Sequence, residues 1–166
     1  KDSVEDKVIF DHLYELSEGK IIGWAQGKAE FGPRALGNRS ILANPSLADM
    51  KDRINANVKF REEYRPFAPS ILEEYAIDYF ENYYPTPYME RVLTIKQEKR
   101  ESLKAVNHID NTGRLQTVSK TLNPHFHNLI SEFNAITNIP VILNTSFNVM
   151  GKPIVDSVTD MAAVFA

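Results

Sequence analysis

FGPRALGNRS, residues 31–40, is the stretch around which the chain is organised. It contains a Gly-Pro pair and a Gly-Asn pair, which favour turns because glycine tolerates positive φ and proline fixes φ. We therefore expect a loop of fixed shape that presents Arg34, Arg39 and free backbone N–H groups. Guanidinium forks and free amides are the donors that a phosphate or carboxylate site requires. The alternative is that both arginines only brace the loop, through carboxylates such as Glu30.

The composition is that of one globular domain. The chain has 166 residues, a formal net charge of -3 and no cysteine. A length of this order suffices for one α/β domain with a hydrophobic core. The missing cysteine excludes disulfides, thiolate metal ligands and a cysteine nucleophile. The charge provides no basic field for nucleic acid or membranes, so an anion site must be a local cluster.

No apolar run approaches the roughly 18 residues of a membrane span, and we expect a cytoplasmic protein that does not contact a membrane. The final residues, VTDMAAVFA, resemble the first turns of a helix that stops in mid-pattern. We therefore expect the chain to be a fragment of a larger protein.

Hydrophobic periodicity and turn residues predict a mixture of helices and strands. We expect helices over residues 4–17, from 44–45 to about 58, over 71–80 and from 123–124 to 136, and strands over 20–26, 41–43, 91–97, 105–109, 114–119 and 139–143. The strands 105–109 and 114–119 are expected to form a hairpin around the turn at 110–113.

A second basic stretch, KFREEYRPFAPS, covers residues 59–70. Its two prolines oppose a regular helix, and in an extended chain Lys59 and Arg61 project to the same face. Together with Arg65 they would suit a polyphosphate, because a lysine offers a mobile charge and an arginine a planar fork. The alternative is a solvated charged turn, since two glutamates lie in the same run.

A polar stretch, Asn144 to Asn148, follows the apolar strand predicted at 139–143. Ligands bind at such strand ends in open α/β sheets. Ser146 and Asn148 are two residues apart and could face one ligand. The alternative is ordinary turn chemistry, because asparagine and serine also favour turns.

His108 and Asp110 would share a face of an extended strand, but two ligands are too few for a transition-metal site. We expect a hydrogen-bonded or core histidine and no metal site in this chain. No Ser-His-Asp arrangement, GxxxxGK[ST] loop or GxGxxG fingerprint is present.

An aromatic, proline-rich loop covers residues 83–88. It could line a base or substrate pocket, although packing over the core is the favoured interpretation.

The three polar loops carry Arg34 and Arg39, the basic residues of 59–65, and Ser146 with Asn148, while Arg114 begins another predicted strand. If these groups converge, they form a site for a multiply charged anion. Two unit charges about 4 Å apart attract by about 1 kcal/mol in water but by about 4 kcal/mol at an effective dielectric near 20. A partly dry cleft of cations would therefore select phosphates.

Four segments in order, EFGPRALGNRSILA, VKFREEYRPFAPS, HIDNTGRLQTV and PVILNTSFNVMGKPIV, resemble the C-terminal domain of the O-carbamoyltransferases. This family includes nodulation proteins and enzymes of antibiotic biosynthesis. The resemblance runs from about residue 19 to 166, and the turn at Asn111 and Gly113 departs from the family's usual Gly and Ala. It implies a single α/β (α+β) domain over residues 1–166, with a YrdC-like, twisted, mostly β sheet and packed helices.

The resemblance also implies a function. Domains of this kind bind carbamoyl phosphate and ATP, and Mg²⁺ accompanies the nucleotide. Carbamate from carbamoyl phosphate attacks the α-phosphorus of ATP, which gives carbamoyl-adenylate and pyrophosphate. An N-terminal, actin-like, metal-binding domain of the same full-length chain then transfers the carbamoyl group to a hydroxyl of a sugar or natural product.

The family's site residues carry over onto matching positions of this sequence. The GPRAL arginine corresponds to Arg34 and the TxRxQT arginine to Arg114. The remaining matches are Lys59, Arg61 and Arg65 in the basic loop, and Ser146 and Asn148 in the SxN element. The resemblance gives Lys59, Arg65, Arg114 and Ser146 the catalytic roles, and all seven residues bind substrate or nucleotide.

Two other functions stay open from the sequence. A YrdC-like fold could present a basic concave face to nucleic acid, but the net charge and the lack of alternating basic and aromatic residues oppose this. The domain could also be a regulatory, anion-binding module that retains the pocket without chemistry.

Overall fold

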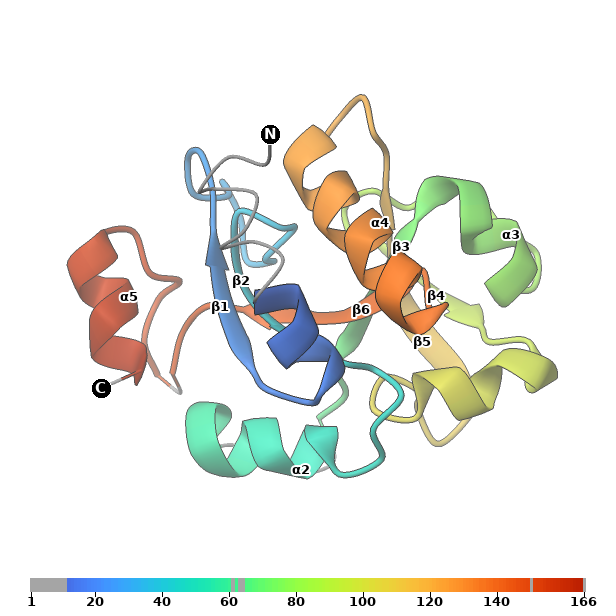
Figure 1. Cartoon of the computed structure of the whole chain (residues 1–166), viewed down its shortest axis with the longest axis horizontal. Helices are drawn as coiled ribbons and strands as arrows, with labels where there is room; N and C mark the ends of the chain where they lie inside the picture. Colours follow the sequence, from blue (N-terminus) through green and yellow to red (C-terminus); the bar gives the residue numbers. More distant parts are fainter. Residues whose placement is uncertain (1–11, 61, 63–64, 150, 166) are drawn as a thin grey trace.

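The computed structural model describes residues 12–60, 62, 65–149 and 151–165, and a six-stranded sheet forms the centre of the fold (Figure 1). The strands are β1 (Ile22–Ala25), β2 (Arg39–Ala43), β3 (Ala68–Leu72), β4 (Arg91–Thr94), β5 (Thr112–Val118) and β6 (Val141–Ser146). Their order across the sheet is β1-β2-β6-β3-β5-β4. β3 and β5 run parallel, and the other neighbours run antiparallel. The order places β2, β3, β5 and β6, which are far apart in sequence, next to one another.

The helical elements are short, apart from one long helix, α4, which lies across the sheet (Figure 1). They are α2 (Met50–Ile54), the π-helix η1 (Asn55–Lys59), the 3₁₀-helices η2 (Glu73–Tyr75) and η3 (Gln97–Leu103), α3 (Ala76–Tyr79), α4 (Pro124–Thr137) and α5 (Val158–Phe165). Residues 12–17 are also helical and agree with the helix predicted at 4–17; the rest of that prediction lies outside the described residues.

Both faces of the central strands are covered, and successive side chains of each strand point to opposite faces. Leu42, Leu72 and Ile142 pack on one side in a cluster with α4 residues, which include Phe126 and Phe133. Their strand neighbours, including Ile41, Ile71 and Leu143, pack on the other side with residues of α2 and η1. The central strands are therefore largely buried on both faces, and each polar side chain within them needs a specific hydrogen-bond partner.

The predicted start of α4 is confirmed. Asn123 is the N-cap, and its side chain accepts a 3.2 Å hydrogen bond from the backbone N–H of Phe126. Pro124 follows at the first position, where the missing N–H costs nothing. The same Asn-Pro signal was misleading at residue 44. There Asn44 accepts hydrogen bonds from the backbone and side chain of Ser46, which makes a turn, and the helix begins only at Met50.

The helix predicted over 71–80 is wrong in its first part, because β3 covers Ala68–Leu72. The misleading residue is Pro69, which argues against a central strand. The N–H of Leu72 bonds to the carbonyl of Pro140, so residues 70 and 68 direct their N–H groups to the same side. Position 69 faces the opposite side, where pairing with β5 begins only at Ser70. The proline is tolerated because no neighbour requires its N–H.

The predicted hairpin of strands 105–109 and 114–119 is also wrong. Residues 101–106 form a 3₁₀ and turn segment, and the strand begins at Thr112, inside the predicted turn. β5 pairs instead with β4 and, in parallel, with β3. The strand predicted at 139–143 runs further, to Ser146, so Asn144 and Ser146 are strand residues rather than loop residues.

Candidate functional site

Two of the three predicted loops meet at Lys59, the last residue of η1. Its ammonium group donates hydrogen bonds to the carbonyl of Ser146, to Ser146 Oγ at 3.2 Å, to the carbonyl of Asn148 at 2.9 Å and to Asn148 Oδ1 at 2.8 Å. Ser146 Oγ donates to Asn148 Oδ1 at 2.7 Å. Lys59 is only 4% exposed. The buried lysine therefore fixes both polar side chains at the end of β6.

A small cavity of about 100 Å³ brings the third loop to the same place. Arg34, Arg114 and Ser146 all line it, and Ser146 joins it to Lys59. Burial lowers the pKa of Arg34, although much of its side chain is exposed, and the charge of Arg114 lowers that pKa further. The Arg34 guanidinium nevertheless stays charged at neutral pH. Two like charges held beside one cavity repel each other, and a bound anion would relieve that repulsion.

Glu30 holds the loop that carries Arg34. Its Oε1 accepts hydrogen bonds from the backbone N–H groups of Leu36 at 2.7 Å, Asn38 at 2.8 Å and Arg39 at 3.3 Å. We expected these loop amides to be free for a ligand, and that expectation is wrong for all three. The carboxylate of Glu30 occupies them and fixes the shape of the loop.

Arg39 has a bracing role, as the alternative interpretation proposed, but through carbonyl groups rather than carboxylates. It lies in β2, is 8% exposed and donates to the carbonyls of Gln26, Gly27 and Asn38 at 2.9 to 3.1 Å. The guanidinium is therefore committed to the loop. Of the two arginines of the organising stretch, only Arg34 lines the small cavity.

A buried network of polar side chains bonds to the backbone of the loop that carries Arg34. Asn144 Nδ2 donates to the carbonyl of Ala35 at 3.1 Å and to Ser70 Oγ and Gln116 Oε1, each at 3.0 Å. Gln116 Nε2 in turn donates to the carbonyl of Leu36 at 2.9 Å. The network ties β3, β5 and β6 to the residues that follow Arg34. Sequence reasoning missed Ser70 and Gln116; the available signal was a polar residue inside an apolar strand.

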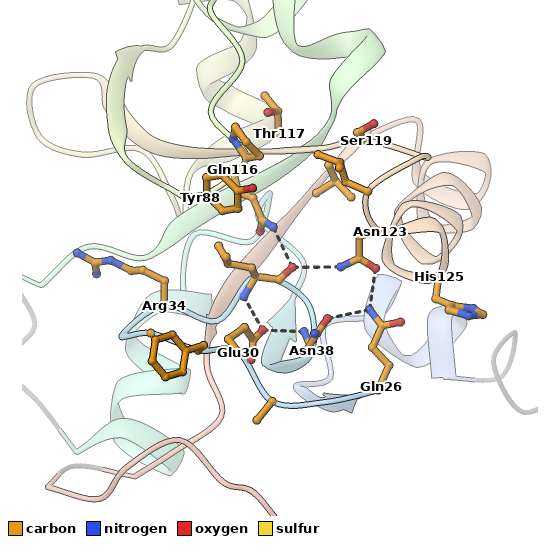
Figure 2. Close-up of a pocket in the computed structure, with 18 of the residues that line it drawn as sticks. Gln26, Glu30, Arg34, Asn38, Tyr88, Gln116, Thr117, Ser119, Asn123 and His125 are labelled. Carbon is orange, nitrogen blue, oxygen red and sulfur yellow. Dashed lines mark hydrogen bonds between the residues drawn. The ribbon is translucent and has the colours of Figure 1, made fainter.

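A larger cavity of about 830 Å³ adjoins the small one, and Pro33 and Arg34 line both. Figure 2 shows its side-chain amides of Gln26, Asn38 and Asn123 grouped together, with Arg34 extending away from them. Gln26 Nε2 donates to Asn123 Oδ1 at 2.9 Å. The cavity has the size and mixed lining of a site for a small organic ligand.

In the aromatic loop at 83–88, some residues line a cavity and others pack over the core, so each of the two interpretations holds for part of the loop. Tyr88 is exposed and lines the large cavity together with Pro87. Tyr83 packs against the core, and Thr86 is fully buried.

Two other basic residues, Arg61 and Arg65, were predicted to belong to the site. Arg65 is exposed, lies 3.9 Å from Glu62 and lines neither of the two cavities. Arg61 lies outside the described residues.

His108 is hydrogen-bonded, as expected, with Nδ1 3.0 Å from Thr112 Oγ1, and it lines the small cavity.

The described residues contain no group of three or more His, Cys, Asp or Glu side chains arranged to hold a metal ion. Within the same residues, no helix combines the length and the apolar character needed to cross a membrane.

Comparison with known families identifies the class. The family model described as Carbamoyltransferase C-terminus matches residues 14–166, so the chain belongs to that family, as the sequence motifs indicated. It is 53% identical over 153 residues to nodulation protein NolNO of Sinorhizobium fredii, covering 90% of this chain and 22% of that protein. It is 39% identical over 146 residues to 3'-hydroxymethylcephem-O-carbamoyltransferase of Amycolatopsis lactamdurans, covering 88% of this chain and 28% of that protein. The chain thus spans about a quarter of the length of these relatives.

The fold has a solved counterpart. The crystal structure of Sua5 from P. abyssi, complexed with L-threonine, superimposes with a TM-score of 0.65 and 16% identity, covering 93% of this chain and 43% of that chain. The expected single-domain, YrdC-like fold with a mixed sheet and packed helices is therefore confirmed.

Proposed function

We propose that this domain binds carbamoyl phosphate and ATP and forms carbamoyl-adenylate. The observation that carries the proposal is the position of Arg34, which lines both the small cavity beside Arg114 and Ser146 and the large cavity next to it. A phosphoryl group near Arg34 would have room for a small carbamoyl compound on one side and for a nucleoside on the other. Membership of the carbamoyltransferase C-terminal family supports this choice of substrates.

The proposed chemistry proceeds in two steps. Water hydrolyses carbamoyl phosphate to carbamate and phosphate, and a carbamate oxygen then attacks the α-phosphorus of ATP while pyrophosphate leaves. Arg34 and Arg114 would bind phosphoryl oxygens and neutralise the charge that accumulates during attack. No covalent enzyme intermediate is required, so a cysteine-free chain can perform this reaction.

Lys59, Ser146 and Asn148 would act as one unit. Lys59 holds both side chains in place. Ser146 Oγ would orient the carbamoyl group by accepting a hydrogen bond from its N–H₂ group, or a phosphate by turning its proton away from Asn148 Oδ1. The family resemblance assigns Arg61 and Arg65 to the same phosphates. Arg65 would have to exchange its contact with Glu62 for a phosphate contact when the substrate binds.

The rest of the reaction would require other components. Mg²⁺ would enter with ATP, coordinated by phosphate oxygens, as is usual for nucleotide sites. We propose that an N-terminal actin-like domain with its own metal passes the carbamoyl group to a hydroxyl of a sugar or natural product. The relative named as a hydroxymethylcephem carbamoyltransferase supports an acceptor of this kind.

Calorimetric titration of the chain with ATP and with carbamoyl phosphate tests the proposal. Arg114→Ala should weaken the binding of at least one of them by about 10- to 100-fold, because a hydrogen bond to a charged group contributes about 1.5 to 3 kcal/mol. Arg91→Ala is the matched control, since Arg91 lies on the adjacent strand with its guanidinium 5.1 Å from the Tyr84 ring centroid and lines neither cavity. Equal affinities in both variants would oppose the proposal.

A further inference from the structure

His108 is a half-buried, titratable side chain that lines the same cavity as the two arginines. It lines the small cavity with Arg34 and Arg114. Its Nε2 is buried and has no partner in hydrogen-bonding geometry within the described part of the chain, although the backbone of Phe67 interacts with the ring. A buried polar atom without a partner is uncommon and requires an explanation, such as a ligand that completes its bonding.

The hydrogen bonds around His108 define its tautomer. Thr112 Oγ1 donates to the Asp110 carboxylate at 2.7 Å, which uses the only hydroxyl proton. His108 Nδ1 lies 3.0 Å from the same Oγ1 and must therefore be the donor in that contact. Nδ1 carries the proton, and Nε2 of the neutral ring is left with a free lone pair.

The surroundings of His108 favour the neutral ring overall. Burial lowers the pKa of His108, and the positive charges of Arg114 and Lys51 lower it further, whereas Asp110 and the backbone of Phe67 favour the protonated ring. A bound phosphate would add negative charge to the cavity side of the ring and so favour protonation at Nε2.

We propose that His108 is a proton-coupled phosphate ligand: its Nε2 is unprotonated in the free protein, takes up one proton when a phosphorylated substrate binds between Arg34 and Arg114, and donates that proton in a hydrogen bond to a phosphoryl oxygen. The inference rests on the proposed function, because it assumes that the small cavity receives the phosphate of carbamoyl phosphate. It adds to the two guanidinium groups a third donor whose charge depends on occupancy.

The affinity for a phosphorylated substrate should depend on pH. Because binding takes up one proton, affinity should rise by up to about tenfold per pH unit as the pH falls from the His108 pKa of the bound state toward that of the free state. The Asp110–Thr112–His108 chain fixes the ring so that the gained proton can only lie on Nε2.

Nuclear magnetic resonance of the chain labelled with ¹⁵N-histidine tests this directly. The probe is phosphonoacetamide, a stable mimic of carbamoyl phosphate, added at about pH 7. His108 is assigned by the signal that is lost in His108→Asn. We expect the Nε2 signal of His108 to move from the unprotonated to the protonated range on saturation, while the three other histidines of the chain keep their signals.

Two variants separate the two nitrogens, because the Asn amide replaces Nδ1 and the Gln amide replaces Nε2. His108→Asn should bind the probe at least tenfold more weakly at pH 6.5 and lose the pH dependence. His108→Gln, a donor that does not titrate, should bind more tightly than His108→Asn, also without pH dependence. If the wild-type chain binds the probe but Nε2 stays unprotonated, the inference is wrong and the proposed function survives. If calorimetry shows no binding of the probe, carbamoyl phosphate or ATP, both are wrong.

Discussion

Lys59 Nζ lies 2.8 Å from Asn148 Oδ1, although 89 residues separate them in the sequence. The contact joins the end of η1 to the residues that follow β6, and Ser146 completes it with a 2.7 Å hydrogen bond to the same oxygen. One ammonium group thus holds together two stretches, each of which was predicted from its own sequence to bind a ligand. Lys59 therefore both fixes the positions of Ser146 and Asn148 and places a positive charge beside them.

Replacing Lys59 by methionine should therefore affect both binding and stability. The substitution keeps most of the side-chain volume but removes the ammonium hydrogen bonds to half-buried acceptors of Ser146 and Asn148, and a hydrogen bond to a charged group contributes about 1.5 to 3 kcal/mol. Urea unfolding should show this loss, and calorimetry should show no binding of ATP or carbamoyl phosphate. Lys152→Met, at an exposed position, is the control and should change neither quantity. Full binding by Lys59→Met would contradict the role given to this lysine.

Glu30 should determine the order of the loop that carries Arg34. In Glu30→Ala the three amides bonded to Oε1 lose their acceptor. Amide hydrogen exchange at Leu36 and Asn38 should accelerate by about 10-fold or more, in line with the loss of charge-assisted hydrogen bonds of about 1.5 kcal/mol or more. Glu81→Ala, an exposed carboxylate that lines neither cavity, should leave these rates unchanged. Unchanged rates in Glu30→Ala would mean that the loop keeps its shape without the carboxylate.

Gly37 packs against Phe126 of α4, and Gly27, which also has a positive φ but no such neighbour, is its matched control. A Cβ at Gly37 would lie 2.3 Å from Phe126 Cδ1, whereas a Cβ at Gly27 would meet nothing within 4 Å. Gly37→Ala combines backbone strain with overpacking and should reduce the free energy of unfolding by about 2 to 5 kcal/mol. Gly27→Ala should cost about 1 kcal/mol from strain alone. Thermal unfolding of both variants measures the difference, and equal losses would show that Phe126 moves aside.

The burial of His108 predicts a pH-dependent stability in the absence of ligand. Burial holds the pKa of His108 below its ordinary value, with Asp110 acting in the opposite direction. The unfolded chain, with a histidine pKa of about 6.5, therefore binds more protons than the folded chain below that pH. The free energy of unfolding should fall as the pH drops from about 7 through the folded-state pKa.

Urea unfolding at several pH values between about 7.5 and 5 measures this slope. In His108→Asn the slope should be smaller than in the wild-type chain, because that titration is removed. The same slope in both proteins would show that other groups cause the pH dependence.

The sequence predicted elements where the signal was local. The start of α4 is one case, because Asn123 and Pro124 act within one turn of the helix that they begin. The strand at Ala68–Leu72 was missed because the tolerance of Pro69 depends on where a neighbouring strand begins to pair. The false hairpin failed for the same reason, since β5 takes its partners from distant segments.

The site was predictable as a set of residue types but not as an arrangement. The residue types of Arg34, Lys59 and Ser146 suggested anion binding, yet Lys59 and Ser146 are 87 residues apart and no spacing rule relates them. The family resemblance assigned these residues to one site, and the order of strands in the sheet explains how they come into contact.

At Glu30 the sequence predicted a site that is not available. The loop amides expected to bind a ligand instead donate hydrogen bonds to the carboxylate of Glu30.

The most direct test of the central claim is pyrophosphate release from ATP and Mg²⁺ by this chain, measured with and without carbamoyl phosphate. The account predicts pyrophosphate only when carbamoyl phosphate is present, with equimolar AMP-containing product, and a loss of about 100-fold or more in Arg114→Ala. No pyrophosphate at saturating ATP and carbamoyl phosphate, or release that is independent of carbamoyl phosphate, would contradict it.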